Sequence, residues 1–236
     1  MATTNTNLKI AFDSWYLRSR FRNRGTYVYA SQILVHLREL ARGCPVQIMP
    51  FVTNGAEDDA RTVAPAPGFE PLTSALLKHE RLWRYGGAWV AGIRSSADVV
   101  FSPGPNSLQF PSRAAKVTTI HDATPVLMPN FAPPGIMRKL RWQMRWAVRR
   151  SDHIIAISES CKRDLMQVYG VPESRISVIY SGYDKALFNQ VPAQPEYLAA
   201  ARQKHGLDKP YIFHHGLMQP RKNINRLIEA YYLLQR

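Results

Sequence analysis

The residues best suited to chemistry form three short stretches spread along the chain. They are Thr119-Ile120-His121-Asp122, Ala156-Ile157-Ser158-Glu159-Ser160 and Gly216-Leu217-Met218-Gln219-Pro220-Arg221-Lys222-Asn223. The first stretch places a histidine at the end of an apolar run, where its ring can bind a sugar hydroxyl or a phosphate and titrates near neutral pH. The third combines a glycine with two cations, a combination that stabilises negative charge developing on a leaving group.

Each of these stretches also has a structural interpretation. We expect His121 and Asp122 to project from a strand end into a cleft, but a lone histidine is often structural and Asp122 has the alternative of capping the turn before Pro125. Gly216 allows close backbone approach to an anion, and Arg221 and Lys222 supply charge, with Arg able to hold two phosphate oxygens. The alternative is a basic helix start on the surface.

The loop after the run Leu8–Asp13 is a fourth candidate. Four arginines lead into Gly25-Thr26-Tyr27-Val28-Tyr29. Asp13 stands at the strand end, Gly25 permits close backbone approach, and Tyr29 lies on the following helix, whose free N–H groups favour an anion. In the alternative interpretation Gly25 is a plain turn residue and the arginines form a solvated loop.

The elements that position these residues alternate between short apolar runs and longer helical patterns, which predicts a parallel α/β sheet. The predicted strands are Leu8–Asp13, Val46–Val52, Asp98–Phe101, Lys116–Ile120, His153–Ile157, Ile176–Tyr180 and Tyr211–His215. The predicted helices are Tyr27–Arg42, Leu72–Ser95, Gly135–Arg150, Glu159–Tyr169, Glu196–His205 and one that begins at Asn223. Ser158 is the expected N-cap of the fourth helix and Gly170 its end, while Thr53–Pro71 is expected to be a surface loop.

The composition limits the class of protein. Lys and Arg number 31 against 17 acidic residues in 236, a formal charge of +14, which indicates a polyanionic partner such as a phosphorylated substrate, an anionic membrane or nucleic acid. Two cysteines and no cluster with ligand spacing predict neither a disulfide framework nor a metal site. Without a signal peptide or membrane span, the sequence predicts a cytoplasmic protein that is either free or peripheral on the inner face of the plasma membrane.

The helix Gly135–Arg150 carries a basic face. Arg138, Arg141, Arg145 and Arg149 recur at three- and four-residue steps beside Trp142 and Trp146, and Ile136, Leu140, Met144 and Ala147 are predicted to form the opposite, apolar face. Arginine with tryptophan suits an anionic bilayer. The alternatives are a solvated helix face and, less favoured because no nucleic-acid-binding motif is found, contact with nucleic acid.

The three stretches, in this order and spacing, resemble retaining glycosyltransferases of family 4, which have two Rossmann-like domains in the GT-B arrangement. The resemblance implies a Rossmann-like fold and transfer of a hexose, with mannose as a candidate, from a nucleotide-diphosphate sugar to a glycan or lipid-linked acceptor, without a cofactor. It implies that His121 lies near the transferred sugar and that Gly25, Tyr29, Gly216, Arg221 and Lys222 bind substrate or phosphate. The chain departs from the family pattern at Tyr27 and Leu217, where a second glycine and an arginine are usual.

The Pro- and Gln-containing segment before residue 196 predicts a domain boundary. We expect residues 1–190 to form an acceptor-side domain and residues 191–236 to form a linker and the first strand, loop and helix of the nucleotide-sugar domain. The glutamate pair of the family's second domain has no counterpart here, so we expect a fragment or a split subunit that is inactive without a missing domain or partner chain. The alternative function is a non-catalytic partner that recruits a second chain to a membrane or binds an acceptor.

Overall fold

The computed structural model describes residues 7–18, 21–22, 24–51, 96–105, 112–130, 132–191, 194–216, 218 and 222–234. The predicted loop Thr53–Pro71 and helix Leu72–Ser95 lie outside these ranges. Contacts divide the chain into two compact units, Met1–Ser181 and Gly182–Arg236. Each unit is described by itself.

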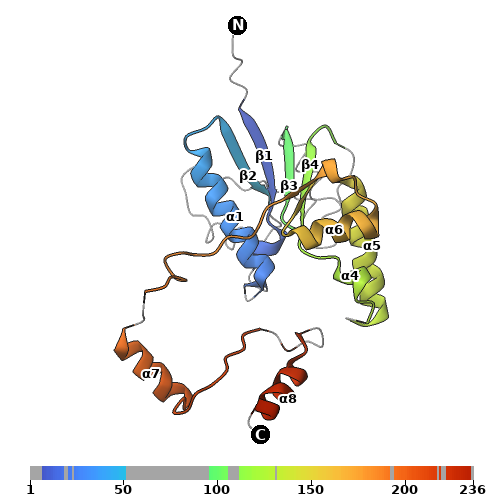
Figure 1. The fold of residues 1–236 in the computed structure, drawn as a ribbon. Coiled ribbons are helices and arrows are strands. Elements are labelled where there is room, and N and C mark those ends of the chain that lie inside the picture. The colour runs from blue at the N-terminus through green and yellow to red at the C-terminus, as the bar shows by residue number, and fades with distance from the viewer. Residues whose placement is uncertain are drawn as a thin grey trace. The chain divides into compact units, whose positions relative to one another are not determined.

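The first unit is built on a six-stranded parallel sheet (Figure 1) in the order β2-β1-β3-β4-β5-β6. Its strands are β1 (Leu8–Asp13), β2 (Val46–Phe51), β3 (Val99–Ser102), β4 (Ala115–Ile120), β5 (His153–Ala156) and β6 (Ile176–Val178). All six coincide with the predicted runs, with ends that differ by up to two residues. The chain therefore has the predicted α/β, Rossmann-like fold. The order reverses between β1 and β3, so their carboxyl ends form the topological switch point where such sheets bind ligands.

The helices of this unit connect successive strands. They are α1 (Gly25–Ala41), the short α4 (Thr124–Leu127), α5 (Pro134–Arg150) and α6 (Glu159–Tyr169), with 3-10 turns η1 (Trp15–Leu17) and η4 (Glu173–Arg175). The predicted caps of α6 are confirmed. The Ser158 hydroxyl accepts a hydrogen bond from the Cys161 N–H at 3.1 Å, and Gly170 ends the helix with φ 65°, a conformation that glycine adopts without steric cost.

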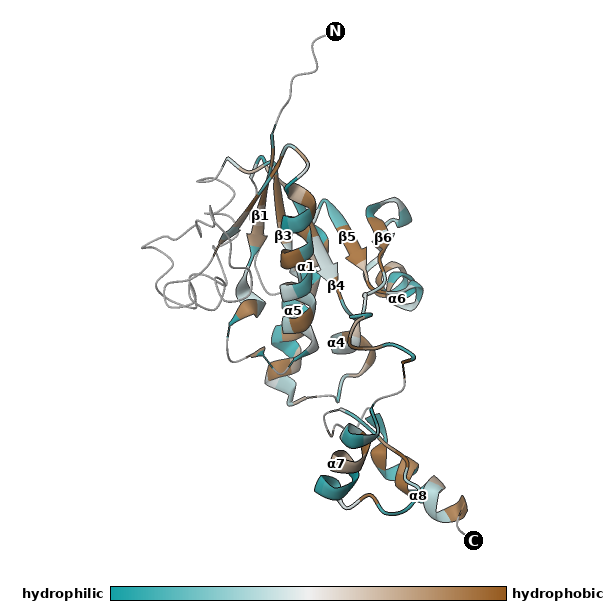
Figure 2. Cartoon of the chain, turned by 90° about the vertical axis from the view of Figure 1, so that its left-hand side faces the viewer, coloured by the Kyte–Doolittle hydropathy of each residue, from teal (hydrophilic) through white to brown (hydrophobic). Residues whose placement is uncertain are grey.

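Helices cover both faces of the sheet. Val117 of β4 packs with the core that includes α1, whereas Ile120 packs with the core that includes α5 and α6. Successive side chains of a strand point to opposite faces. Thr119 and His121 therefore continue the α1 side of β4. Figure 2 shows the hydrophobic colouring of β1 and β3.

The buried face of α5 differs from the predicted one. Met144 and Ala147 are buried as predicted, but Ile136 is 51% exposed, and Met137 and Val148 are buried instead. Met144 and Val148 pack in the core cluster that includes Ile120 of β4 and Leu165 of α6. The apolar spacing alone did not distinguish this face from one that includes residue 136. The C-terminal end of α5 is closed by a cation, since the Arg175 guanidinium donates to the carbonyl oxygens of Val148 (at 3.1 Å) and Ser151.

Two aspartates fasten the amino ends of neighbouring strands. The Asp98 carboxylate accepts a hydrogen bond from the Lys9 N–H at 2.8 Å, and the Asp152 carboxylate accepts one from the Lys116 N–H at 2.7 Å. The Lys116 ammonium also pairs with Asp152 at 3.0 Å. Burial alone would raise the pKa of Asp152, but the Lys116 hydrogen bonds and the charges of Lys116 and Arg175 together lower it.

The second unit contains α7 (Pro195–His205) and α8 (Ile224–Leu234). The predicted strand Tyr211–His215 is not formed: these residues are described without strand pairing. A strand requires a hydrogen-bonding neighbour, and the described part of this unit has no other strand. None of the helices in the described part of the chain is long and apolar enough to cross a membrane.

Replacement of Asp152 by asparagine tests the strand-end pairing. Because the folded state lowers the pKa of this carboxyl, its charge stabilises the fold above the unfolded pKa of about 3.9, and that stabilisation is lost as the pH falls through the folded pKa. We expect Asp152→Asn to lower the free energy of unfolding at pH 7 by only about 0.5–1 kcal/mol, because the Lys116–Asp152 ion pair is partly exposed. When urea unfolding is measured from pH 7 to pH 2.5, the difference in free energy of unfolding between the variant and the wild type should vanish in acid. A difference that is equal at both ends of this range would contradict the assignment.

Candidate active site at the switch point

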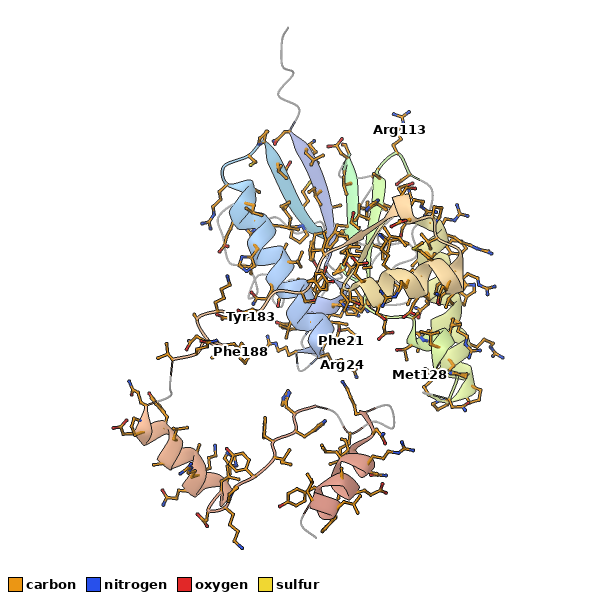
Figure 3. All side chains as sticks on the ribbon, in the orientation of Figure 1. Phe21, Arg24, Arg113, Met128, Tyr183 and Phe188 are labelled. Carbon is orange, nitrogen blue, oxygen red and sulfur yellow. The ribbon has the colours of Figure 1, made fainter. Side chains whose placement is uncertain are left out.

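The carboxyl ends of β1, β3 and β4 gather several of the predicted residues at one edge of the sheet. Asp13 ends β1, Pro103 and Gly104 follow β3, and His121 follows β4. The N-terminus of α1 and the short α4 lie at the same end of this unit, as the labels on Arg24 and Met128 show (Figure 3). The site is thus composed of segments that are far apart in sequence.

The imidazole of His121 has a defined orientation. Its Nε2 lies 2.9 Å from the carbonyl oxygen of Pro103. A carbonyl oxygen only accepts hydrogen bonds, so Nε2 must carry the proton. In the neutral ring this leaves Nδ1 unprotonated, with a lone pair available to accept a hydrogen bond. His121 as a whole residue is half-buried.

Tyr29 of α1 packs against this ring. The two ring centroids are 4.9 Å apart with the planes at 86°, an edge-to-face arrangement. The phenol oxygen of Tyr29 lies 3.0 Å from the hydroxyl oxygen of Thr119, which is fully buried on β4. Burial raises the pKa of Tyr29, while the hydrogen bond with Thr119 acts in the opposite direction. Tyr29 is therefore a neutral side chain that joins α1 to two residues of β4.

Gly104 is a residue of this site that the sequence did not single out. A Cβ atom built on Gly104 would lie 2.7 Å from Cζ of Tyr16 and 2.5 Å from Cε2, closer than atoms pack. The tyrosine ring thus occupies the space that a side chain would need, and it supports the turn that presents the Pro103 carbonyl. The available signal was a glycine flanked by Pro103 and Pro105 directly after a strand.

The two aspartates stabilise local turns. Asp13 is 1% exposed, and its carboxylate accepts a hydrogen bond from the Trp15 N–H at 3.0 Å, at the start of η1. The exposed Asp122 accepts one from the Thr124 N–H at 3.0 Å, at the start of α4. The turn-capping interpretation of Asp122 is therefore the one that the structure shows.

Gly25 is the first residue of α1, and an added Cβ would meet no atom within 4 Å. Arg24, at the N-cap, makes no side-chain capping bond, while its carbonyl oxygen accepts a hydrogen bond from the Tyr27 N–H at 3.0 Å. Arg24 instead lies over the ring of Phe21, with 5.8 Å between its Cζ and the ring centroid. The open backbone at Gly25 is compatible with the approach of an anion.

In the second unit, Gly216 has φ 147°, a conformation that residues with a side chain rarely adopt. Lys222 is exposed, and the next residue, Asn223, is left-handed with φ 52° just before α8. Arg221 lies outside the described residues. The glycine at 216 is thus required by the backbone, and the structure leaves Lys222 accessible.

The basic face of α5 is exposed. Arg138, Arg145 and Arg149 are exposed, Trp142 is 46% exposed, and Trp146 is half-buried. Arg141 is exposed as well, but its Nε donates to the Pro125 carbonyl at 2.6 Å and so ties α4 to α5. No group of three or more potential metal ligands occurs in the described ranges.

Replacement of Gly104 by alanine tests the support of the Pro103 turn. We expect Gly104→Ala to lower the free energy of unfolding by about 1–3 kcal/mol, because the new methyl group must displace the Tyr16 ring. Gly135→Ala is the matched control: Gly135 lies in α5 with open space around it, so this change should be neutral or stabilise by up to about 1 kcal/mol. Urea unfolding measures both. A Gly104→Ala protein as stable as the wild type would show that the Tyr16 ring leaves room for a side chain at position 104.

Residues 24–187 match the model of Glycosyltransferase Family 4. The chain is 27% identical over 149 residues to O-antigen chain mannosyltransferase B of Escherichia coli, covering 62% of this chain and 37% of that protein. It is 24% identical over 214 residues to O-antigen chain mannosyltransferase RfbU of Salmonella typhimurium, covering 87% of this chain and 54% of that protein.

Among solved structures, a glycosyltransferase from Rickettsia africae ESF-5 aligns with a TM-score of 0.45 at 15% identity, over 86% of this chain and 50% of that one. The chain spans between about a third and about half of the length of the two mannosyltransferases above. The family match extends from the residue before α1 to beyond β6 and includes Tyr29, Thr119 and His121. The chain belongs to Glycosyltransferase Family 4.

Proposed function

We propose that this chain carries the acceptor-side domain and the start of the donor-side domain of a retaining hexosyltransferase. The single observation that supports this best is the oriented His121 at the switch point of a family 4 sheet. The relatives are named as O-antigen mannosyltransferases, which makes mannose the first candidate for the transferred sugar. The donor is a nucleotide-diphosphate sugar bound as a substrate, and no cofactor takes part.

His121 contributes through its ring nitrogens. As the bond between sugar and diphosphate breaks, positive charge develops on the sugar and negative charge on the leaving group. A hydrogen bond to the sugar or its phosphate that strengthens at this stage accelerates the reaction rather than only improving binding. The ring needs a fixed position for this role, and the Pro103 carbonyl supplies one.

The diphosphate requires fixed cations and N–H donors, because no metal ligand cluster is predicted in the sequence. We propose that the second unit supplies them through Gly216, Arg221 and Lys222. Gly216 has no side chain to hinder the approach of its backbone to a phosphate, and Lys222 is exposed. Since the chain spans about half of its relatives or less, we propose that it does not turn over without the remainder of the donor domain, whether in the same protein or in a partner.

The acceptor is a glycan or a lipid-linked glycan, and we propose that α5 holds the enzyme on an anionic bilayer. Six basic residues and no acidic one occur in α5. The adjacent α4 and the residue after it expose apolar side chains, with Val126 36%, Leu127 51% and Met128 45% exposed. Charge on one helix and exposed apolar side chains on its neighbour suit an interfacial position, where each basic residue contributes about 1 kcal/mol.

The full-length protein tests the proposed reaction. Incubated with GDP-mannose and a membrane extract or synthetic lipid-linked glycan, it should transfer hexose with retention of the anomeric configuration, as measured by mass spectrometry and NMR of the product. His121→Ala should lower turnover more than about tenfold, a loss of roughly 1.4 kcal/mol or more in transition-state stabilisation. Circular dichroism should remain unchanged. Normal turnover in the folded variant would assign His121 a structural role, and absence of transfer from any nucleotide sugar would favour the non-catalytic partner.

Vesicle sedimentation tests the basic face of α5. The chain should bind vesicles that contain acidic lipid and ignore neutral ones, and binding should fall steeply with salt because the Debye length is about 10 Å at 0.1 M. The triple change Arg138→Gln, Arg145→Gln and Arg149→Gln should abolish binding without lowering stability, since these side chains are exposed.

The matched control removes the same charge from the second unit, by Arg202→Gln, Lys204→Gln and Lys209→Gln, and should still bind the acidic vesicles. Equal loss in both triple variants would mean that net charge, and not this face, determines binding. Arg141 is left unchanged in this test because it bonds the Pro125 carbonyl.

A further inference from the structure

We infer that Tyr29 is a positioning residue, which acts through His121 by holding the imidazole in a single orientation with the proton on Nε2. The inference rests on the role proposed above for His121. It is carried by two contacts on this ring from different elements, the Pro103 carbonyl after β3 and the edge-to-face ring of Tyr29 on α1. A third contact, between the Thr119 hydroxyl and the Tyr29 phenol, restrains the tyrosine.

The hydrogen bond to Pro103 determines which nitrogen carries the proton, but one hydrogen bond does not fix the plane of a ring. An imidazole can turn about its Cβ–Cγ bond, and this rotation would replace Nε2 by a carbon atom opposite the carbonyl. Tyr29 opposes the rotation because its ring packs at 86° against the imidazole, with 4.9 Å between centroids. Edge-to-face packing of this kind is directional.

Tyr29 is itself restrained at its far end. Its phenol oxygen lies 3.0 Å from the hydroxyl oxygen of Thr119, which has 0% exposure and lies in β4. His121 directly follows β4, two positions after Thr119. One tyrosine therefore contacts His121 with its ring and Thr119 with its hydroxyl, and α1 cannot shift along β4 without breaking both contacts.

The alternative is that Tyr29 only fills space between α1 and the sheet. A space-filling residue would affect stability alone, whereas a positioning residue also changes the proton distribution on His121. The distinction can be measured in this chain without substrate, by the nitrogen chemical shifts of its seven histidines labelled with ¹⁵N. The His121→Gln variant assigns the His121 signals by their disappearance.

In the wild type we expect the neutral His121 ring to be a single Nε2–H form. Tyr29→Leu removes the aromatic edge and should produce a mixture of the two neutral forms. Tyr29→Phe and Thr119→Val each remove only the hydrogen bond between the Tyr29 and Thr119 hydroxyls. Each should also produce a mixture of the two neutral forms of His121, with less of the Nδ1–H form than in Tyr29→Leu. Because Tyr29→Phe and Thr119→Val preserve side-chain volume, we expect both to fold, and they test the inference even if Tyr29→Leu does not fold.

The matched control is Tyr27→Leu, on the same helix two residues earlier and half-buried, which should leave the His121 signals unchanged. A single Nε2–H form that persists in all three test variants would overturn the inference. So would an equal disturbance of His121 by Tyr27→Leu.

Turnover of the full-length protein separates this inference from the proposed function. We expect Tyr29→Phe to lower kcat about threefold to tenfold with little change in KM. If His121→Ala leaves turnover intact while Tyr29→Leu still disturbs the His121 signals, the proposed function of His121 fails and its orientation by Tyr29 stands. If His121→Ala abolishes turnover but none of the test variants changes the His121 signals, the proposed function of His121 stands and its orientation by Tyr29 fails.

Discussion

Parallel pairing of β1, β3 and β4 is the constraint on which the site depends, because it brings three strand ends to the same edge of the sheet. The Pro103 carbonyl and the His121 ring come from neighbouring strands, and their hydrogen bond joins the two loops that leave those strands. Tyr29 adds α1 to this junction through Thr119. A change in register between β3 and β4 would therefore disturb the histidine as well as the core.

Much of the fold could be predicted from the sequence, because strands buried between two helical layers are continuous apolar runs. The six strands in the described part of the first unit were predicted on this basis, and the end of α6 was predicted from Gly170. The buried face of α5 was predicted only in part, since Ile136 and Met137 are both apolar and their spacing alone does not decide which of them is buried. Tyr211–His215 has strand-like composition, but composition cannot supply the neighbouring strand that pairing requires.

The sequence predicted several residues of the site, but it did not predict which of them contact one another. His121 stood out because it follows an apolar run, but its partner is a backbone carbonyl, which has no sequence signature. The contact between Tyr29 and Thr119 joins residues 90 positions apart. Gly104 is constrained by Tyr16, whose ring leaves no room for a side chain. Such constraints arise only when distant strands meet.

The most direct test of the proposed function of His121 is a crystal structure of the full-length protein with an intact nucleotide sugar. The account predicts that Nδ1 of His121 lies within hydrogen-bond distance of an oxygen of the sugar or its phosphate, while Nε2 keeps its bond to the Pro103 carbonyl. A nucleotide sugar bound with its hexose remote from His121, or with the imidazole turned away from Pro103, would contradict it.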